Sequence, residues 1–453
     1  MTRFLRELEV RVPGVSRLIR GAARYVFPDH WTFLFGEIAL YCFLVLVVTG
    51  VYLTFWFDPS LATTTYHGSY APLDGSQMSV AYRSTVDLSL DTRAGLLVRQ
   101  THHWAALVFI VSLLLHMLRV FFTGAFRKPR DLNWYLGLTM LTVSLVEGFA
   151  GYSLPDDLLS GMGLAIAYSV VMSVPWLGAH LALWAWNGAF PGSGAIEQRL
   201  YILHVLILPL LIAALLGLHL FLVALLKHTV FPGPGQTDTT VVGTRLWPGY
   251  ALRSLGLLFA VVGVLVALGG LVQINPVWQY GAFETWLGTN GAQPDWYLGW
   301  LIGALRLMPA FDVVIGGRTV IPNPFFGGVL FPTVLFGLLY AWPILERRLT
   351  RDHALHHVLD RPRDAPNRTA AGAALFAFVA TIFVAGSADR IFVSIGISYE
   401  RQVWLFRIAT LVVPLAVFVV VRSVARELRD DDWHPLRGSD ARTVRRTERG
   451  GFR

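Results

Sequence analysis

Long runs of apolar residues recur along the chain and are separated by shorter polar loops. Runs of about 20 apolar residues are long enough to cross the hydrocarbon core of a membrane as helices. Eight such runs occur, at residues 36–57, 102–122, 135–152, 201–226, 250–274, 325–345, 370–386 and 403–422. The pattern predicts an all-α polytopic membrane protein with eight transmembrane helices.

Lysine and arginine are concentrated in alternate loops, and this distribution sets the topology of a membrane protein. Six arginines precede the first run, and Arg127, Lys128 and Arg130 follow the second. The loop after the sixth run and the C-terminal tail are also basic, whereas the loops between them are acidic or balanced, as at Asp156 and Asp157. We therefore expect a multi-pass protein of the cell membrane with both termini in the cytoplasm. A helix N-terminus or a solvated loop is the favoured explanation of these two aspartates.

Composition agrees with a membrane location. Of the 453 residues, 55% are hydrophobic and only 15% are charged. The positive-inside rule and anionic lipid explain the net charge of +8, which leaves little reason to expect nucleic acid as a partner. Cys42 is the only cysteine, so the chain has no disulfide framework and no CxxCH haem-attachment site. We expect this thiol to be packed in the protein core.

Two of the apolar runs carry a histidine near each end. His102 and His116 are 14 residues apart, and His204 and His219 are 15 apart. On ideal helices the two histidines of each pair point in directions about 40–60° apart around the helix axis, so they share one face. They lie roughly 21–22 Å apart along the axis. Both runs cross the membrane in the same direction by the predicted topology. His102 is therefore expected level with His204, and His116 level with His219.

Neutral imidazole is an axial ligand of haem iron, so two matched levels predict two non-covalent haem b groups, each held by two histidines. A single transmembrane histidine is equally well explained as a satisfied polar core residue. Four histidines in matched pairs favour ligation. Arg99 and Arg119 lie three residues beyond a histidine, toward opposite water interfaces, where a guanidinium can pair with haem propionates. Snorkelling explains either arginine alone equally well.

Glycine repeats the histidine spacing. Gly36 and Gly50 in the first run, and Gly137 and Gly151 in the third, are each 14 residues apart. A haem ring packed against a helix needs a position without a side chain. Small residues also mediate ordinary helix packing in membranes, but the shared period favours haem contact.

The chain also carries longer motifs that point to one family. Its paired histidines, its glycine spacing, "GYSLPDD" at 151–157 and "PDWY" at 294–297 resemble the cytochrome b subunit of quinol–cytochrome c reductases. Four stretches are similar to the actinobacterial, menaquinol-oxidising branch: "GFAGYSLPDDLLSG", "KHTVFPGPG", "QPDWYLGWLIGALRLMP" and "HHVLDRPRDAPNRTA". The resemblance runs from about residue 15 to residue 425.

The resemblance implies eight transmembrane helices, with an N-terminal four-helix di-haem bundle followed by a C-terminal four-helix half. We expect four segments: a basic amphipathic cytoplasmic segment (1–35), the di-haem bundle (36–232), the C-terminal half (233–424) with an outer quinol-site loop (275–324), and a polar cytoplasmic tail (425–453).

The implied activity is quinol oxidation at an outer site. One electron would pass to a Rieske iron–sulfur protein, and the other would pass through the two haems to an inner quinone site, building a proton gradient. Further implied partners are a cytochrome c subunit, a terminal cytochrome oxidase in a supercomplex, membrane lipid and a second copy of the chain. The implied quinone is menaquinone.

The "PDWY" loop supplies the expected quinol site. Asp295 is placed to hydrogen-bond the quinol hydroxyl and accept its proton. Pro294, Trp296, Tyr297 and Tyr152 would complete the pocket near the outer haem. The commonest motif of the family has glutamate at the position of Asp295, so this carboxylate is one methylene shorter.

Other positions depart from family patterns. Leu34 occupies the position where the photosynthetic branch has a haem-attaching cysteine, so no third haem is expected. Arg253 and Ser254 occur where mitochondrial relatives place an acidic residue at the inner quinone site. The inner proton donor is therefore unassigned, with Lys227 and His228 as candidates and interfacial anchoring as an equally good explanation of both.

Three further features have simpler explanations. The histidines His353, His356 and His357 have metal-site spacing but lie in a basic loop, so a solvated loop is favoured over a metal site. Residues 17–27 are a basic amphipathic stretch, expected as a helix on the membrane surface. The tail from Arg422 onward is expected to be poorly ordered.

Two other functions remain open from sequence. A secondary transporter would explain many spans and intramembrane histidine, although not the matched depths or the glycine period. A simple haem-b electron carrier would explain the four histidines, although not the "PDWY" loop.

Overall fold

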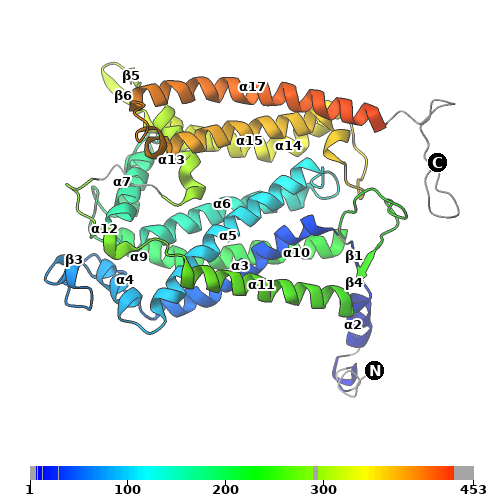
Figure 1. The fold of residues 1–453 in the computed structure, drawn as a ribbon, viewed down its shortest axis with the longest axis horizontal. Helices are drawn as coiled ribbons and strands as arrows, with labels where there is room; N and C mark the ends of the chain where they lie inside the picture. The colour runs from blue at the N-terminus through cyan, green and yellow to red at the C-terminus, as the bar shows by residue number, and fades with distance from the viewer. Residues whose placement is uncertain (1–6, 8, 13, 29, 289–293, 433–453) are drawn as a thin grey trace.

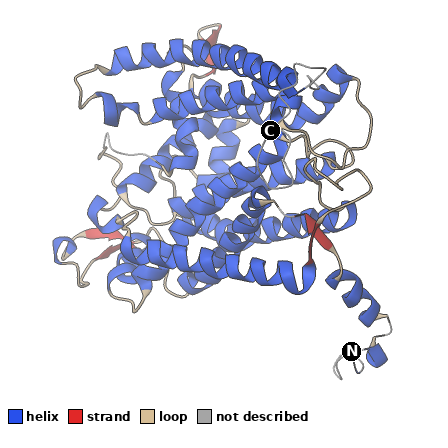
Figure 2. Cartoon of the chain, turned by 45° about the vertical axis from the view of Figure 1, so that its right-hand side comes forward, coloured by secondary structure: helices blue, strands red, loops and turns tan. Residues whose placement is uncertain are grey.

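The computed structural model describes residues 7, 9–12, 14–28, 30–288 and 294–432. Long helices dominate it and lie side by side (Figure 1), and strands are few and short (Figure 2). The helices are α2 (Val15–Ala23), α3 (Leu34–Thr54), α4 (Val80–Leu90), α5 (Gly95–Phe122), α6 (Asp131–Ser153), α7 (Leu158–Met172), α8 (Gly178–Trp186), α9 (Ala195–Ile202), α10 (Leu208–Leu226), α11 (Ala251–Leu271), α12 (Val277–Tyr280), α13 (Gly299–Leu307), α14 (Phe331–Thr350), α15 (Pro366–Gly386), α16 (Ala388–Phe392) and α17 (Tyr399–Asp432).

Seven helical segments are long and apolar enough to cross a membrane. They are Trp31–Thr54, Gly95–Phe122, Ala195–Leu226, Leu246–Leu271, Phe326–Thr350, Pro366–Gly386 and Tyr399–Arg429. Each corresponds to a predicted run. These runs form helices because a segment in lipid must satisfy its backbone polar groups internally. The third predicted run lies in α6, which has 23 residues but is not among the seven. The count of eight crossings therefore stays a prediction.

Three short antiparallel ribbons cap the helix ends in the described part of the chain. They pair β1 (Val26–Pro28) with β4 (Gly243–Arg245), β2 (Thr63–Thr65) with β3 (Gln77–Ser79), and β5 (Val313–Ile315) with β6 (Arg318–Ile321). In Figure 1 the β1–β4 ribbon lies at the same end of the molecule as α2 and the last turns of α17, and the other two ribbons lie at the opposite end. Helix α2 and the last turns of α17 thus lie at the same end of the molecule, which agrees with an even number of crossings.

The helices pack in two groups that touch along one side. In the first group α3 packs along α5, α10 along α6, and α11 against both α3 and α5. In the second group α15 packs against α13 and α17, and α14 contacts α6 (Figure 1). Cys42 is fully buried in the core of the first group beside Phe109 and Ile110, which confirms the expected packed thiol.

The helix that carries His204 and His219 is not uniform. Residues Leu203–Ile207 form a π-helical turn between α9 and α10, and His204 lies within it. A π-helical turn accommodates one more residue than an α-helical turn. His204 and His219 are 15 residues apart, one more than His102 and His116. The π-helical turn accommodates this extra residue.

Two expectations about the chain ends need correction. Helix α17 continues to Asp432, so the residues after Arg422 are helical where we expected poor order, and residues 433–453 lie outside the described part. The predicted helix at 17–27 is observed as α2, but it ends at Ala23 and the chain then enters β1. The pairing of β1 with β4 gives residues 26–28 backbone partners that a helix end would lack.

Candidate functional site

The four histidines of α5 and of the α9–α10 segment form two pairs. We call His102 and His204 the outer pair, and His116 and His219 the inner pair. The ring centres are 6.2 Å apart in the outer pair and 6.4 Å apart in the inner pair, with the rings inclined at 78° and 72°. Two imidazoles on one metal have ring centres about 6 Å apart, because each metal–nitrogen bond is about 2.0 Å long and each ring centre lies about 1 Å beyond it. Both pairs fit that separation.

A glycine lies behind each of these histidines. A Cβ atom added at Gly36 would lie 3.2 Å from His116, one at Gly50 would lie 3.3 Å from His102, and one at Gly137 would lie 4.0 Å from His219. At Gly151 the added Cβ would lie only 2.3 Å from Cε1 of His204. The predicted glycines and histidines therefore meet in the structure, two glycines from α3 and two from α6.

Hydrogen bonds orient the outer pair for ligation. The Thr49 hydroxyl donates to the Val45 carbonyl at 2.6 Å, so its oxygen accepts from Nδ1 of His102 at 2.8 Å. Nδ1 of His204 lies 3.1 Å from the Glu147 carbonyl oxygen and 3.0 Å from Oε1 of the same residue. Because these partners are acceptors, both Nδ1 atoms carry the hydrogen. That tautomer leaves each Nε2 lone pair free for a metal.

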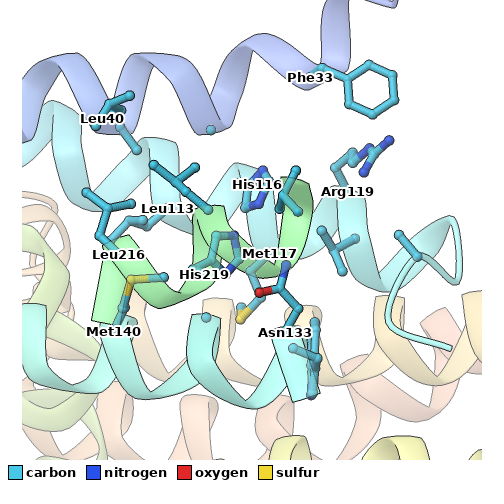
Figure 3. Close-up of a pocket in the computed structure, with 18 of the residues that line it drawn as sticks. Phe33, Leu40, Leu113, His116, Met117, Arg119, Asn133, Met140, Leu216 and His219 are labelled. Carbon is cyan, nitrogen blue, oxygen red and sulfur yellow. The ribbon is translucent and has the colours of Figure 1, made fainter. Parts of the chain in front are cut away.

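The inner pair lies in a cavity of about 260 Å³. Its walls include Gly36, Gly137 and Arg119 as well as both histidines. In Figure 3 the rings of His116 and His219 lie next to each other between the helices. Both Nδ1 atoms of this pair are buried without a well-aligned hydrogen bond among the described residues, although the Asn133 backbone contacts the His219 ring.

The two arginines differ in their surroundings. Nε and one terminal nitrogen of Arg119 are buried without a hydrogen-bond partner, and its guanidinium lies 4.2 Å from the centre of the Phe33 ring (Figure 3). Arg99 is 8% exposed, and its guanidinium donates to the Asn275 carbonyl at 3.0 Å, although its Nε is also buried without a partner among the described residues. Unpaired guanidinium nitrogens at the inner level are suited to an anionic group such as a propionate.

Asp295 is held from two sides. Nε2 of His103 lies 2.8 Å from one carboxylate oxygen, and the Tyr297 hydroxyl donates to the other at 3.2 Å. The side chains of His103 and Asp295 are 14% and 15% exposed. Tyr297 is buried against Gly148 of α6. The loop motif is thus fixed against His103, the residue that follows His102.

A second, apolar cavity of about 520 Å³ lies next to this loop. Pro294 lines it together with residues of α6, α7, α13 and α14. Trp296 packs against the core of the first helix group, and Tyr152 is buried at the end of α6. The structure therefore brings Pro294 to the cavity wall. Asp295 instead contacts His103 of α5, and Tyr297 packs against Gly148 of α6.

The aspartates of "GYSLPDD" take different roles. Asp157 is 1% exposed and caps α7, because its carboxylate accepts from the backbone nitrogens of Leu159 and Ser160. The helix N-terminus explanation is confirmed for this residue. Asp156 has a positive φ of 53° in the turn before α7, outside the membrane-spanning helices. Burial, and secondarily the neighbouring acids Asp157 and Glu284, raise the pKa of Asp156 to about 7, against a lowering contribution from the Ser79 side chain.

Asp156→Asn is expected to stabilise the protein at high pH only. The raised pKa means that folding favours the neutral acid, so this residue reduces stability as the pH rises from about 4 through 7. Asparagine also tolerates positive φ and carries no charge. We expect a thermal midpoint about 2–4 °C above wild type at a pH of about 8.5 and no difference at about 4.5. Thermal unfolding in detergent measures this, and an equal gain at both pH values would contradict it.

The inner end holds the two candidate proton donors. Lys227 donates to the Ala224 carbonyl at 2.9 Å, and Nδ1 of His228 lies 3.2 Å from the Tyr25 hydroxyl. Burial, followed by the charges of Arg119, Arg130 and Lys227, lowers the pKa of His228 to about 4. A neutral His228 has no ring proton in excess to donate near neutral pH, which favours an anchoring role for it.

A carboxylate absent from our predictions lies beside the same cavity. Glu37 of α3 accepts from the hydroxyls of Ser254 at 2.7 Å and Tyr41 at 3.4 Å, and also from Tyr250. Glu37 and Tyr250 both line the inner cavity. In the sequence, Ser254 is notable only as a departure from the mitochondrial pattern. In the structure it donates a hydrogen bond to Glu37, an acidic residue of another helix.

The histidines after α14 do not form a metal cluster in the described residues, where no group of three or more His, Cys, Asp or Glu side chains is suitably arranged. His356 pairs with Asp352 at 3.0 Å, and the backbone nitrogen of His357 donates to Asp238. The loop explanation of these histidines stays a prediction.

Three polar residues of the site were missed by sequence reasoning: Glu37, His103 and Glu147. Glu37 and Glu147 are the only charged residues in the first and third apolar runs, and an isolated charge in a span is a signal of function. His103 directly follows His102, but its partner Asp295 is 192 positions away and comes from a different element. Spacing alone cannot indicate that contact.

Comparison with known proteins identifies the family. Residues 107–282 match the family described as Cytochrome b(N-terminal)/b6/petB. The "Cytochrome bc1 complex cytochrome b subunit" of Streptomyces coelicolor is 42% identical over 440 residues, covering 97% of this chain and 80% of that protein. The chain belongs to the cytochrome b family of cytochrome bc1 complexes. The subunit of the same name from Mycobacterium tuberculosis H37Rv is 45% identical over 439 residues, covering 96% and 79%.

These relatives confirm the resemblance to the actinobacterial cytochrome b branch. A cytochrome b of this family is a subunit of a quinol–cytochrome c oxidoreductase. The fold agrees as well. A chain of the solved structure titled "Hyperthermophilic respiratory Complex III" superposes with a TM-score of 0.70 over 93% of this chain and 98% of that chain. At 20% identity, this likeness concerns the cytochrome b fold alone.

Proposed function

We propose that the chain oxidises menaquinol at an outer site and returns electrons to quinone at an inner site, with two haem b groups held between them. One observation carries the proposal: two histidine pairs with ring centres 6.2 and 6.4 Å apart, each histidine facing a glycine. Bis-histidine ligation fits this geometry, and the glycines leave room for a flat ring. Bound there, the haems supply one-electron carriers between the two faces of the membrane.

The residues at the outer loop perform the proton chemistry. Asp295 accepts a proton from the quinol hydroxyl, while His103 and Tyr297 fix the carboxylate in place. The cavity beside Pro294 takes the apolar quinol ring and tail. Oxidation to quinone releases two electrons and two protons in total. One electron leaves to a Rieske iron–sulfur partner, because a chain with one cysteine cannot hold such a cluster itself.

Quinone reduction is assigned to the inner end of the chain, beside the cavity of the inner pair. Glu37 and Tyr250, which line that cavity, supply hydrogen-bonding groups, and Ser254 donates to Glu37. Proton uptake on this side and release at the outer side make turnover electrogenic. We further propose a cytochrome c subunit and a second copy of the chain as partners, association with a terminal oxidase, and cytoplasmic termini in the cell membrane.

Haem content of the purified protein tests the proposal. We expect two haem b per polypeptide in wild type, and one in each of His116→Ala and His204→Ala. The two variants should retain haems with different spectra, since each loses a different pair. Absence of haem in wild type would overturn the proposal and favour the transporter. Loss of both haems in both variants would contradict two independent sites.

A further inference from the structure

The two histidine pairs differ in what their second ring nitrogens contact. In the outer pair, Nδ1 of His102 has the Thr49 hydroxyl at 2.8 Å and Nδ1 of His204 has Glu147 at 3.0 Å. In the inner pair, neither Nδ1 makes a well-aligned hydrogen bond among the described residues, although the uncharged backbone of Asn133 contacts the His219 ring. The difference separates two sites that are otherwise built alike.

Glu147 is the strongest of these contacts. It is the only charged residue in the third apolar run, and its side chain is 18% exposed, as is that of His204. Its Oε1 and its backbone carbonyl both face the same ring nitrogen, at 3.0 and 3.1 Å. Its second carboxylate oxygen is buried and makes no hydrogen bond to any described residue. The carboxylate is therefore directed at the histidine.

A carboxylate that accepts the Nδ1 hydrogen makes an imidazole a stronger electron donor through Nε2. A stronger donor stabilises ferric over ferrous iron, so it lowers the midpoint potential of the haem. A hydroxyl acceptor acts in the same direction, but less, because it carries no charge. The Asn133 backbone beside His219 is likewise uncharged, and His116, without an Nδ1 partner, receives no such contribution.

We propose that Glu147, acting through His204, and Thr49, acting through His102, lower the midpoint potential of the outer haem. The inference rests on the proposed function, since it requires a haem at each pair. It assigns Glu147 as a positioning residue that acts through His204 and does not touch the quinol.

Redox titration of the haem b absorbance in the purified complex tests this proposal with Glu147→Gln. Glutamine keeps the size and the backbone carbonyl contact but is a weaker, uncharged acceptor. At a fixed ambient potential we expect the ratio of reduced to oxidised outer haem to rise about tenfold, which corresponds to about 59 mV for a one-electron couple. The inner haem in the same sample should not shift.

Two further variants control the measurement. Ser144→Ala alters a buried hydroxyl on the same helix, which has no hydrogen-bond partner in the described residues, and should move neither potential. Thr49→Val should raise the outer potential by less than Glu147→Gln. It also provides the test if Glu147→Gln assembles without its outer haem.

The outcomes separate the inference from the proposed function. Fewer than two haems in the wild-type complex would contradict the proposed function. Two haems with an unmoved outer potential in Glu147→Gln, or equal shifts of both haems, would overturn only the role of Glu147. If Glu147→Gln assembles without its outer haem, an unmoved outer potential in Thr49→Val would overturn the inference that Nδ1 acceptors of the outer pair set the potential of the outer haem.

Discussion

Asp295→Asn is expected to lower quinol-dependent reduction of cytochrome c by about 10²–10³-fold while both haems stay bound. The substituted side chain keeps its size and can still hydrogen-bond His103 and Tyr297, so the loop should retain its position. The amide cannot accept the quinol proton. The loss should therefore appear in turnover with little change in the haem spectrum.

Steady-state turnover with a menaquinol analogue, beside a haem spectrum of the same preparation, measures this effect. Asp74→Asn is a matched control, because Asp74 also pairs with a histidine, His67 at 3.0 Å, but on an exposed surface. It should leave turnover at the wild-type rate. Unchanged turnover in Asp295→Asn would instead favour a simple electron carrier with an incidental "PDWY" loop.

The features that follow from helical periodicity could be predicted from the sequence. Spacing along one helix predicted the histidine levels, since position on a helix depends only on residue number. The same reasoning placed Gly36 and Gly151 near a haem, and the structure brings them against His116 and His204. A resemblance to cytochrome b was equally accessible, because its motifs are contiguous.

Features that depend on contacts between elements could not be predicted. The π-helical turn at His204 changes the angular relation of that pair, and ideal helix geometry does not include it. The pairing of His103 with Asp295 joins α5 to a loop 192 positions away. Glu147 meets His204 because α6 packs against the π-helical turn Leu203–Ile207, and no local pattern specifies that register. The polar partners of the site are therefore a product of tertiary packing.

Gly151→Ala is expected to eliminate the outer haem, whereas Gly137→Ala should leave the inner haem in place. A Cβ at residue 151 would lie 2.3 Å from Cε1 and 2.8 Å from both ring nitrogens of His204. The ring is held by Glu147 and cannot retreat without losing that contact. A Cβ at residue 137 would lie 4.0 Å from His219, which is ordinary van der Waals contact.

The two substitutions form an internally matched pair. Both replace glycine by alanine on α6, so each adds the same methyl group and the same gain in helix propensity of about 1 kcal/mol. General effects on the helix therefore cancel in the comparison, and a difference in haem content reports the contact with each histidine. We expect about one haem per polypeptide in Gly151→Ala and two in Gly137→Ala, measured by haem extraction against protein. Equal haem content in the two variants would mean that the His204 ring can move, and that the glycine at 151 is retained for helix packing instead.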